Sequence, residues 1–496
     1  MGIVIRQSLK ATAATLVGSV LGAVSIVVAS RMVGMQELGF SRMLAAYGSI
    51  AGILLTLGFH AVVSVFLFRY DSDRHKRASL MGVSLLIPVV VSLLCFAFYF
   101  FSKESLLQLF QPADRPLFRQ FFIWFPVISL LVTVQAVLEG FLMTEMKITV
   151  FTTVREVGLK GGNLLLILLY GGSLISFSQW IYGIALLYGV ANGLLLFSAL
   201  RTGHFRVSLR WQVFSRRELY DIFHFAGFHA LLGVTVYLVG YLDSILLAPL
   251  DQQGLNASAI YTNALFIISL LQIPYRAMTA SVTPALTEAY AQDDQPKVQD
   301  VFNRSSINIF LATLGMAVLI VANLKKGVEL LGPGYELVVP LVGVLLTGRL
   351  LDAATGLNEQ VLSVSKHYRY SFLLSLLLAV LLFALGYALI PVYGVYGAAW
   401  ASTGALGLYN LGKWGVVWRK TGLQPFSAAT VRLLLAAVAA LLPVLLVPEI
   451  PVWILDVGVR TAVAGGIYLA LVLWLRPSAD FNSFVEGLLR RVGRKK

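Results

Sequence analysis

Apolar segments separated by short polar breaks run along almost the entire chain. Most are about 20 residues long or longer, which is enough for a helix to cross a hydrocarbon core of about 30 Å. The pattern therefore predicts an all-α, polytopic membrane protein with about 14 transmembrane helices. We place these spans at residues 8–30, 43–68, 80–101, 121–142, 150–170, 175–200, 222–250, 257–286, 307–324, 337–364, 370–390, 396–417, 431–447 and 453–475.

The composition excludes several other protein classes. Of the 496 residues, 58% are hydrophobic and 12% are charged, whereas soluble domains carry about 45–50% apolar and about 25% charged residues. The mean hydropathy is +0.82, so the chain is neither soluble and globular nor disordered. The single cysteine, Cys95, cannot form an intrachain disulfide bond.

The net charge of +14 indicates basic cytoplasmic loops rather than a nucleic-acid partner, because Lys and Arg are concentrated on the inner side of membrane proteins. With the N-terminus inside, and with Lys10 counted in the N-terminal segment, the inner segments hold 24 basic residues and the outer loops hold 7. We therefore expect a multi-pass protein of the plasma (inner) membrane with both termini in the cytoplasm.

The polar segments offer no recognisable enzyme site. The pair Asp71 and Asp73 resembles a metal-binding Asp-x-Asp motif, but Arg69, Arg74 and Lys76 surround it and would repel a cation. The histidines are scattered rather than spaced as metal ligands, and a phosphate-binding Gly-x-x-x-x-Gly-Lys loop does not occur. We predict no catalytic residue, no metal and no cofactor, and thus a protein that is not an enzyme.

An internal repeat relates the two halves of the chain. Spans one and two resemble spans seven and eight, since each pair has a small-residue-rich helix, a short loop with a late glycine, and a second helix. Parallel repeats of this kind are a transporter architecture. We expect a lobe of six helices at residues 1–205, a second such lobe at 206–425, and two further helices with a basic cytoplasmic tail at 426–496.

Five short segments resemble one known family in their order along the chain. They are RMVGMQELG at 31–39, AIY at 259–261, PAL at 284–286, LGPGY at 331–335 and, as the most specific, PVYGVYGAA at 391–399. Together they are similar to the Wzx-type polysaccharide flippases of the multidrug/oligosaccharidyl-lipid/polysaccharide (MOP) exporter superfamily. The resemblance extends over about residues 5–420.

This resemblance implies a two-lobed bundle that carries undecaprenyl-diphosphate-linked oligosaccharides outward by alternating access. The expected partners are the lipid-linked oligosaccharide, membrane lipids and, as a further candidate, the polysaccharide polymerase machinery. Two alternatives stay open: a multidrug or lipid II exporter of the same superfamily, and an integral membrane polysaccharide polymerase or ligase. The last class generally needs a large outer loop, and the longest one expected here is residues 102–120.

Charges inside the predicted spans are the candidate functional residues, because a charge at the bilayer centre costs at least about 2.5–3.5 kcal/mol. Arg276 and Arg349 are candidates for holding the diphosphate, which a guanidinium binds with two parallel hydrogen bonds. Arg31 and Arg42 flank the first outer loop and are further substrate-binding candidates, with a lipid-headgroup contact as the alternative.

Two carboxylates are candidates for ion coupling. Asp243 lies in the seventh span and Glu359 in the tenth. Arg349, Asp352 and Glu359 recur on one face of a predicted helix, where Arg349 and Asp352 neutralise each other and leave Glu359 unpaired. The energy source is either the membrane potential or antiport of protons or sodium.

Other charges within the spans have simpler interpretations. Lys413 is expected to extend its side chain toward a span end. Glu156 and Lys160 are four residues apart and are expected to pair with each other.

Overall fold

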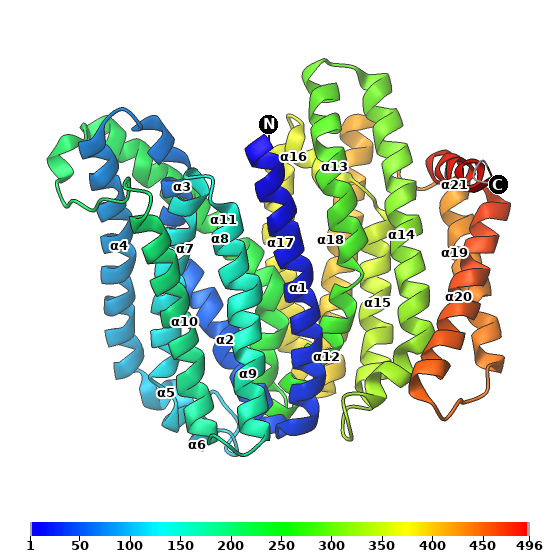
Figure 1. The fold of residues 1–496 in the computed structure, drawn as a ribbon, viewed down its shortest axis with the longest axis horizontal. Helices are drawn as coiled ribbons and strands as arrows, with labels where there is room; N and C mark the ends of the chain where they lie inside the picture. Colours follow the sequence, from blue (N-terminus) through cyan, green and yellow to red (C-terminus); the bar gives the residue numbers. More distant parts are fainter. Residues whose placement is uncertain (1, 494–496) are drawn as a thin grey trace. The chain divides into compact units, whose positions relative to one another are not determined.

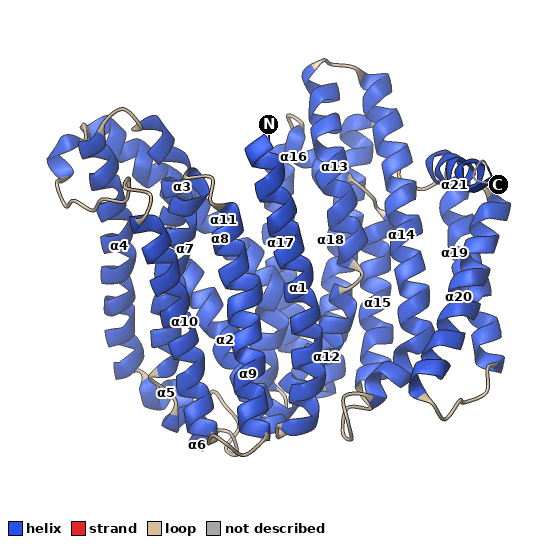
Figure 2. Cartoon of the chain, viewed as in Figure 1, coloured by secondary structure: helices blue, strands red, loops and turns tan. Residues whose placement is uncertain are grey.

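The computed structural model describes residues 2–493, and every regular element among them is helical (Figures 1 and 2). Nine helices are long and apolar enough to cross a membrane, or eleven if each of two bent helix pairs counts as one span, within the described residues. The predicted all-α, multi-pass membrane fold is therefore confirmed, whereas the number of 14 spans stays a prediction.

The chain divides into two compact units, Met1–Ala259 and Ile260–Lys496. The first unit is a bundle of helices, two of which are short and lie on a single connection. Its helices are α1 (Gly2–Met32), α2 (Met35–Leu55), α3 (Phe59–Arg69), α4 (Arg74–Phe101), α5 (Lys103–Gln108), α6 (Arg115–Gln120), α7 (Trp124–Thr144), α8 (Ile148–Thr153), α9 (Lys160–Gly171), α10 (Phe177–Leu200) and α11 (Arg216–Leu250). A π-helical turn, Val154–Leu159, joins α8 to α9.

The second unit begins within α12 and holds the remaining helices. They are α12 (Leu255–Ser269), α13 (Gln272–Ala291), α14 (Gln295–Glu329), α15 (Val338–Ala354), α16 (Asn358–Val364), α17 (Tyr368–Tyr393), α18 (Val395–Thr421), α19 (Ala428–Leu441), α20 (Trp453–Leu475) and α21 (Ala479–Gly493). Since only three residues separate α13 from α14, the segment 287–306 between the predicted eighth and ninth spans is mostly helical.

Two predicted spans are broken by glycines with left-handed backbone conformations. The second span divides into α2 and α3 at Gly58, whose φ is +79°; a β-carbon there would lie 2.0 Å from the carbonyl oxygen of Ala226 on α11. The tenth divides into α15 and α16, bent by 49°, at Gly356, whose φ is +63°. A glycine tolerates both the positive φ and the close approach, and hydrophobic periodicity alone does not reveal either requirement.

An aromatic core fixes one end of the first unit. The buried ring of Phe40 on α2 contacts Phe118, Phe121, Phe125 and Phe177, at centroid distances of 5.2–6.0 Å. Such edge and tilted contacts add to the free energy gained by burying apolar surface. The predicted outer loop at 102–120 therefore folds into α5 and α6, since Phe118 is buried in this core.

At the other end of this unit, a charged pair ties α4 to the start of α11. Lys76 Nζ lies 2.7 Å from Glu218 Oε1, and each side chain is 26% exposed. Glu218 also caps α11, because its carboxylate accepts a hydrogen bond from the Ser215 backbone N–H. The hydrogen bonds from Lys76 and Ser215 lower the pKa of Glu218 to about 2, so this carboxyl group is ionised at neutral pH.

Candidate functional site

A small pocket in the second unit gathers polar side chains from three helices. It has a volume of about 170 Å³ and lies where α13, α14 and α15 meet. We call it the arginine pocket. Its lining residues are Leu271, Gln272, Tyr275, Arg276, Thr313, Arg349, Asp352 and Ala353.

The two predicted diphosphate-binding residues both line the arginine pocket. Arg276 lies in the second turn of α13, is exposed, and donates a hydrogen bond from Nη2 to Gln272 Oε1 at 2.6 Å. Arg349 comes from α15 and is half-buried. Thr313 of α14 is 2% exposed, and its hydroxyl has no hydrogen-bond partner within the described part of the chain. The pocket thus combines two guanidinium groups with a buried hydroxyl group, all of which can donate to an anion.

A buried lysine next to this pocket was not predicted as a functional residue. Lys413 on α18 is 4% exposed, and its Nζ lies 3.7 Å from Asp352 Oδ1 and 3.9 Å from Glu359 Oε2. It also lies 4.3 Å from the centroid of the Tyr409 ring. The expectation that Lys413 extends to a span end is therefore wrong, because the face of α18 that carries it packs against protein.

Glu359 is not the unpaired acid that the sequence predicted. Ser371 of α17 and Tyr409 of α18 donate hydrogen bonds to its carboxylate, and Lys413 lies nearby. The protein itself therefore already donates hydrogen bonds to the carboxylate of Glu359, which the sequence predicted as an ion-coupling residue.

The predicted continuous helical face is also wrong. The break at Gly356 places Asp352 on α15 and Glu359 on α16. Where the sequence suggested a pair of Asp352 with Arg349, the structure shows an ion pair of Asp352 with Lys413. Lys413, which is distant in sequence, thus forms the ion pair with Asp352 that was expected from Arg349 on the same helix.

The other candidate carboxylate, Asp243, belongs to the first unit. It lies on α11, is 9% exposed, and accepts a hydrogen bond from the Ser244 backbone N–H at 2.8 Å. The two proposed ion-coupling residues therefore lie in separate units of the chain. Their role in coupling remains a prediction.

Arg31 and Arg42 differ in their surroundings, although the sequence placed both beside the first outer loop. Arg31 lies in the last turn of α1 and is exposed. Arg42 lies two turns into α2, where its Nη1 donates to the Ala259 carbonyl oxygen at 3.1 Å. It lines a pocket of about 250 Å³ together with Lys160 and Trp180. Arg42 is thus a more enclosed candidate than Arg31.

Four charged side chains from α7, the π-helical turn and α9 neutralise one another. Lys160 Nζ lies 2.7 Å from Glu156 Oε2, as predicted from their spacing. Arg155 contacts both Glu156, at 3.3 Å, and Glu139, at 3.4 Å. Because the two acids face two bases, this cluster needs no ligand to balance its charge.

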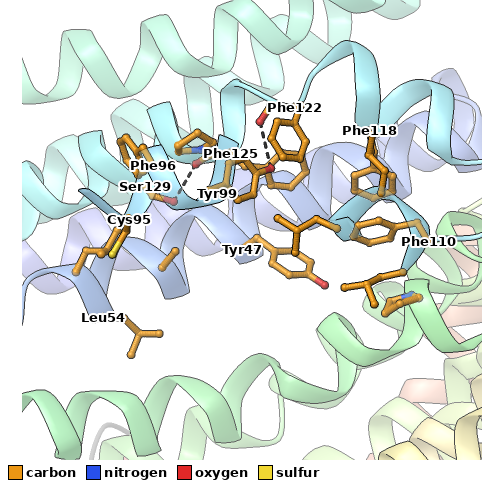
Figure 3. A pocket seen from close by; sticks show the side chains of 17 residues that line it. Tyr47, Leu54, Cys95, Phe96, Tyr99, Phe110, Phe118, Phe122, Phe125 and Ser129 are labelled. Carbon is orange, nitrogen blue, oxygen red and sulfur yellow. Dashed lines mark hydrogen bonds between the residues drawn. The ribbon is translucent and has the colours of Figure 1, made fainter. Parts of the chain in front are cut away.

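A larger, apolar pocket lies in the first unit (Figure 3). It has a volume of about 440 Å³ and is bounded by α2, α4, α7, the α5–α6 connection and the end of α11. Figure 3 shows its side chains extending from Leu54 and Cys95 to Phe110 and Phe118. We call it the aromatic pocket. The sequence did not predict this pocket, because aromatic residues within apolar segments are equally expected in a packed core or on a lipid-facing surface.

Solved structures with the same fold include transporters and a flippase. "Lipid II flippase MurJ, inward closed conformation" has a TM-score of 0.73 and 14% identity, covering 94% of this chain and 98% of that one. An inward-facing multidrug resistance MATE family transporter of the MOP superfamily has a TM-score of 0.67 and 14% identity, covering 82% and 94%. A variant of the Vibrio cholerae MATE transporter VcmN has a TM-score of 0.54 and 14% identity, covering 84% and 98%.

These likenesses confirm the fold of the MOP superfamily. No match was found among curated proteins. The sequence does match a known family, described as polysaccharide biosynthesis protein, over residues 4–290. Because this match covers more than half of the 496 residues, the chain belongs to the polysaccharide biosynthesis protein family.

Proposed function

We propose that this protein moves an undecaprenyl-diphosphate-linked oligosaccharide across the plasma membrane for surface polysaccharide biosynthesis. Three findings support the proposal: the family, the fold shared with transporters and a flippase, and the arginine pocket. The observation that carries it is the presence of both Arg276 and Arg349 in one pocket.

The arginine pocket suits a diphosphate better than it suits a cationic drug. A guanidinium binds phosphate oxygens with paired, charge-assisted hydrogen bonds. The negative charge of Asp352, the one acid that lines the pocket among its described residues, is offset by Lys413 at 3.7 Å. The local charge therefore favours an anionic ligand.

Transport by alternating access completes the proposal. The lobes proposed from the sequence, 1–205 and 206–425, would change their relative arrangement around the substrate, with 426–496 attached to the second lobe. Both termini would lie in the cytoplasm. Arg31 and Arg42 are proposed to contact the phosphates during passage.

The membrane potential is the proposed energy source. A diphosphate carries roughly two negative charges, and each charge that crosses 100 mV changes the free energy by about 2.3 kcal/mol. Outward movement from a negative interior is therefore favourable. Lys413 already supplies a fixed positive charge between Asp352 and Glu359, which reduces the need for a coupling cation there.

A second candidate substrate is lipid II, the lipid after which the MurJ flippase is named. The observation that favours this candidate is the shared fold with the MurJ flippase, with a TM-score of 0.73 over 98% of the MurJ chain. Purified protein in proteoliposomes separates the two candidates. A labelled undecaprenyl-diphosphate oligosaccharide should cross, whereas lipid II, which shares the diphosphate and the polyprenyl chain but carries a different saccharide, should bind without crossing. Crossing of lipid II alone would favour the second candidate, and crossing of neither lipid would contradict both.

The proposed orientation has its own test in a C95A background. Gln252 and Gln212 are both exposed, and the orientation places them outside and inside, respectively. Gln252→Cys should react with an impermeant thiol reagent in intact cells, whereas Gln212→Cys should react only after the membrane is opened. The reverse labelling pattern would contradict the orientation inferred from the 24 inner and 7 outer basic residues.

A further inference from the structure

We propose that the aromatic pocket of the first unit holds part of the polyprenyl chain of the lipid-linked substrate. This inference rests on the proposed function, because it assigns a second portion of the same ligand. The arginine pocket is assigned to the diphosphate, and the aromatic pocket to hydrocarbon.

The polar groups of the aromatic pocket are already engaged within the protein. The Tyr47 hydroxyl donates to the Ile245 carbonyl oxygen at 3.1 Å. The hydroxyl groups of Tyr99 and Ser129 likewise donate to backbone carbonyl oxygens, at 3.2 Å and 2.8 Å. A sugar or phosphate in this pocket would lose its hydrogen bonds to water without replacement, which is unfavourable. The pocket therefore favours a hydrocarbon.

The wall formed by α4 gives this pocket access to the hydrocarbon layer. Cys95 lines the pocket and is exposed, and its neighbour Leu94 is 66% exposed. Phe98, one turn further along, is 75% exposed. Large apolar side chains exposed together on a membrane-spanning helix form a lipid-facing surface, so a lipid chain can enter beside Cys95.

The lining of the pocket, rather than its size, favours a polyprenyl chain over a compact drug. Its volume of about 440 Å³ lies within the range of pockets that hold drug-sized ligands, about 300–1,000 Å³. Drug sites usually add a few convergent polar groups that fix orientation, and the hydroxyl groups here are occupied. The partly exposed side chains of Leu54, Phe96 and Phe110 offer apolar surface against which methyl-branched alkene units can pack.

The single cysteine provides a direct test. Undecaprenyl monophosphate should slow the modification of Cys95 by a small, lipid-permeable maleimide in nanodiscs. At about ten times its dissociation constant, a ligand leaves about one site in eleven free, so the rate should fall about tenfold. The matched control is the C95A/L94C variant, whose cysteine lies outside the pocket lining and should react at an unchanged rate.

Other outcomes would overturn the inference. Equal slowing at both positions, no slowing at Cys95, or equal protection by phosphatidic acid or by a cationic drug would each contradict a polyprenyl site. Leu54→Trp, which narrows the pocket, should abolish the protection while leaving thermal unfolding unchanged. Transport without protection of Cys95 would contradict this inference alone, whereas protection without transport would contradict the proposed function alone.

Discussion

The two units contain pockets of opposite chemistry. In the first unit, the hydroxyl groups that line the aromatic pocket donate to backbone carbonyl oxygens. In the second, the arginine pocket contains two guanidinium groups and the buried hydroxyl of Thr313, which has no partner among the described residues. Pockets between similarly apolar helices can therefore favour different ligands. The difference depends on whether the polar groups of the lining already form hydrogen bonds within the protein. This difference is the basis on which we propose that the two pockets bind different parts of one amphipathic lipid.

The largest effect is expected from removing both guanidinium groups. Hydrogen bonds to charged groups contribute about 1.5–3 kcal/mol each, so R276A/R349A should reduce diphosphate binding and flipping by more than about a hundredfold. The single variant R276K should retain only part of the wild-type activity, because a lysine ammonium group cannot form the paired contact of a guanidinium group. Proteoliposome flipping measures this, with R419A, an exposed arginine of α18, as the control. Wild-type flipping by the double variant would remove the arginine pocket from the mechanism.

The next effect concerns the charges beside the arginine pocket. Lys413→Met leaves Asp352 and Glu359 without their nearby cation, so the free energy of unfolding should fall by about 3 kcal/mol. Neutralising all three positions, in D352N/E359Q/K413M, should recover most of it. Unfolding in detergent measures both, with K420M on the same helix as the control. Equal stability of K413M and wild type would show that the lysine is not needed to balance these acids.

A smaller effect is expected at Asp243 in the first unit. If the membrane potential drives transport, a potential alone should support net flipping, and Asp243→Asn should slow flipping without abolishing it. Proteoliposomes with either a potential or a pH gradient separate the two energy sources. An inactive D243N variant, together with transport driven only by the pH gradient, would favour proton antiport instead.

The smallest effect is expected at the pair of Lys76 and Glu218, which lines neither pocket. Glu218→Gln should destabilise the first unit by about 1 kcal/mol at pH 7, since a partly exposed pair contributes little. The pKa of Glu218 is lowered to about 2, so its contribution is fully present above the unfolded value of about 4.3. The difference in unfolding free energy between variant and wild type should therefore shrink as the pH falls from about 4.3 toward 2. A difference that stays constant over this range would contradict the pairing.

The sequence predicted helices better than their breaks. Apolar length is a direct consequence of membrane thickness, so an all-helical, multi-pass fold could be predicted, while the number of 14 spans stays a prediction. The breaks at Gly58 and Gly356 depend on close contacts with α11 and α14, which are distant in sequence. No periodicity along one segment encodes such contacts.

The candidate site was predicted in part for a similar reason. Arg276 and Arg349 stand out because charges are costly in an apolar segment. Lys413 was misjudged because its distance from a span end does not reveal which side of α18 faces protein. The partners of Glu359 come from α17 and α18, and only the folded chain brings them together.

Recognition of a diphosphate by Arg276 and Arg349 can be measured directly as a difference in affinity. The experiment compares the dissociation constants of undecaprenyl diphosphate and undecaprenyl monophosphate for wild type and for R276A/R349A. Wild type should prefer the diphosphate by at least about tenfold, equivalent to about 1.4 kcal/mol, and the double variant should bind both lipids equally. An unchanged preference in the double variant would contradict the assignment of the diphosphate to the arginine pocket.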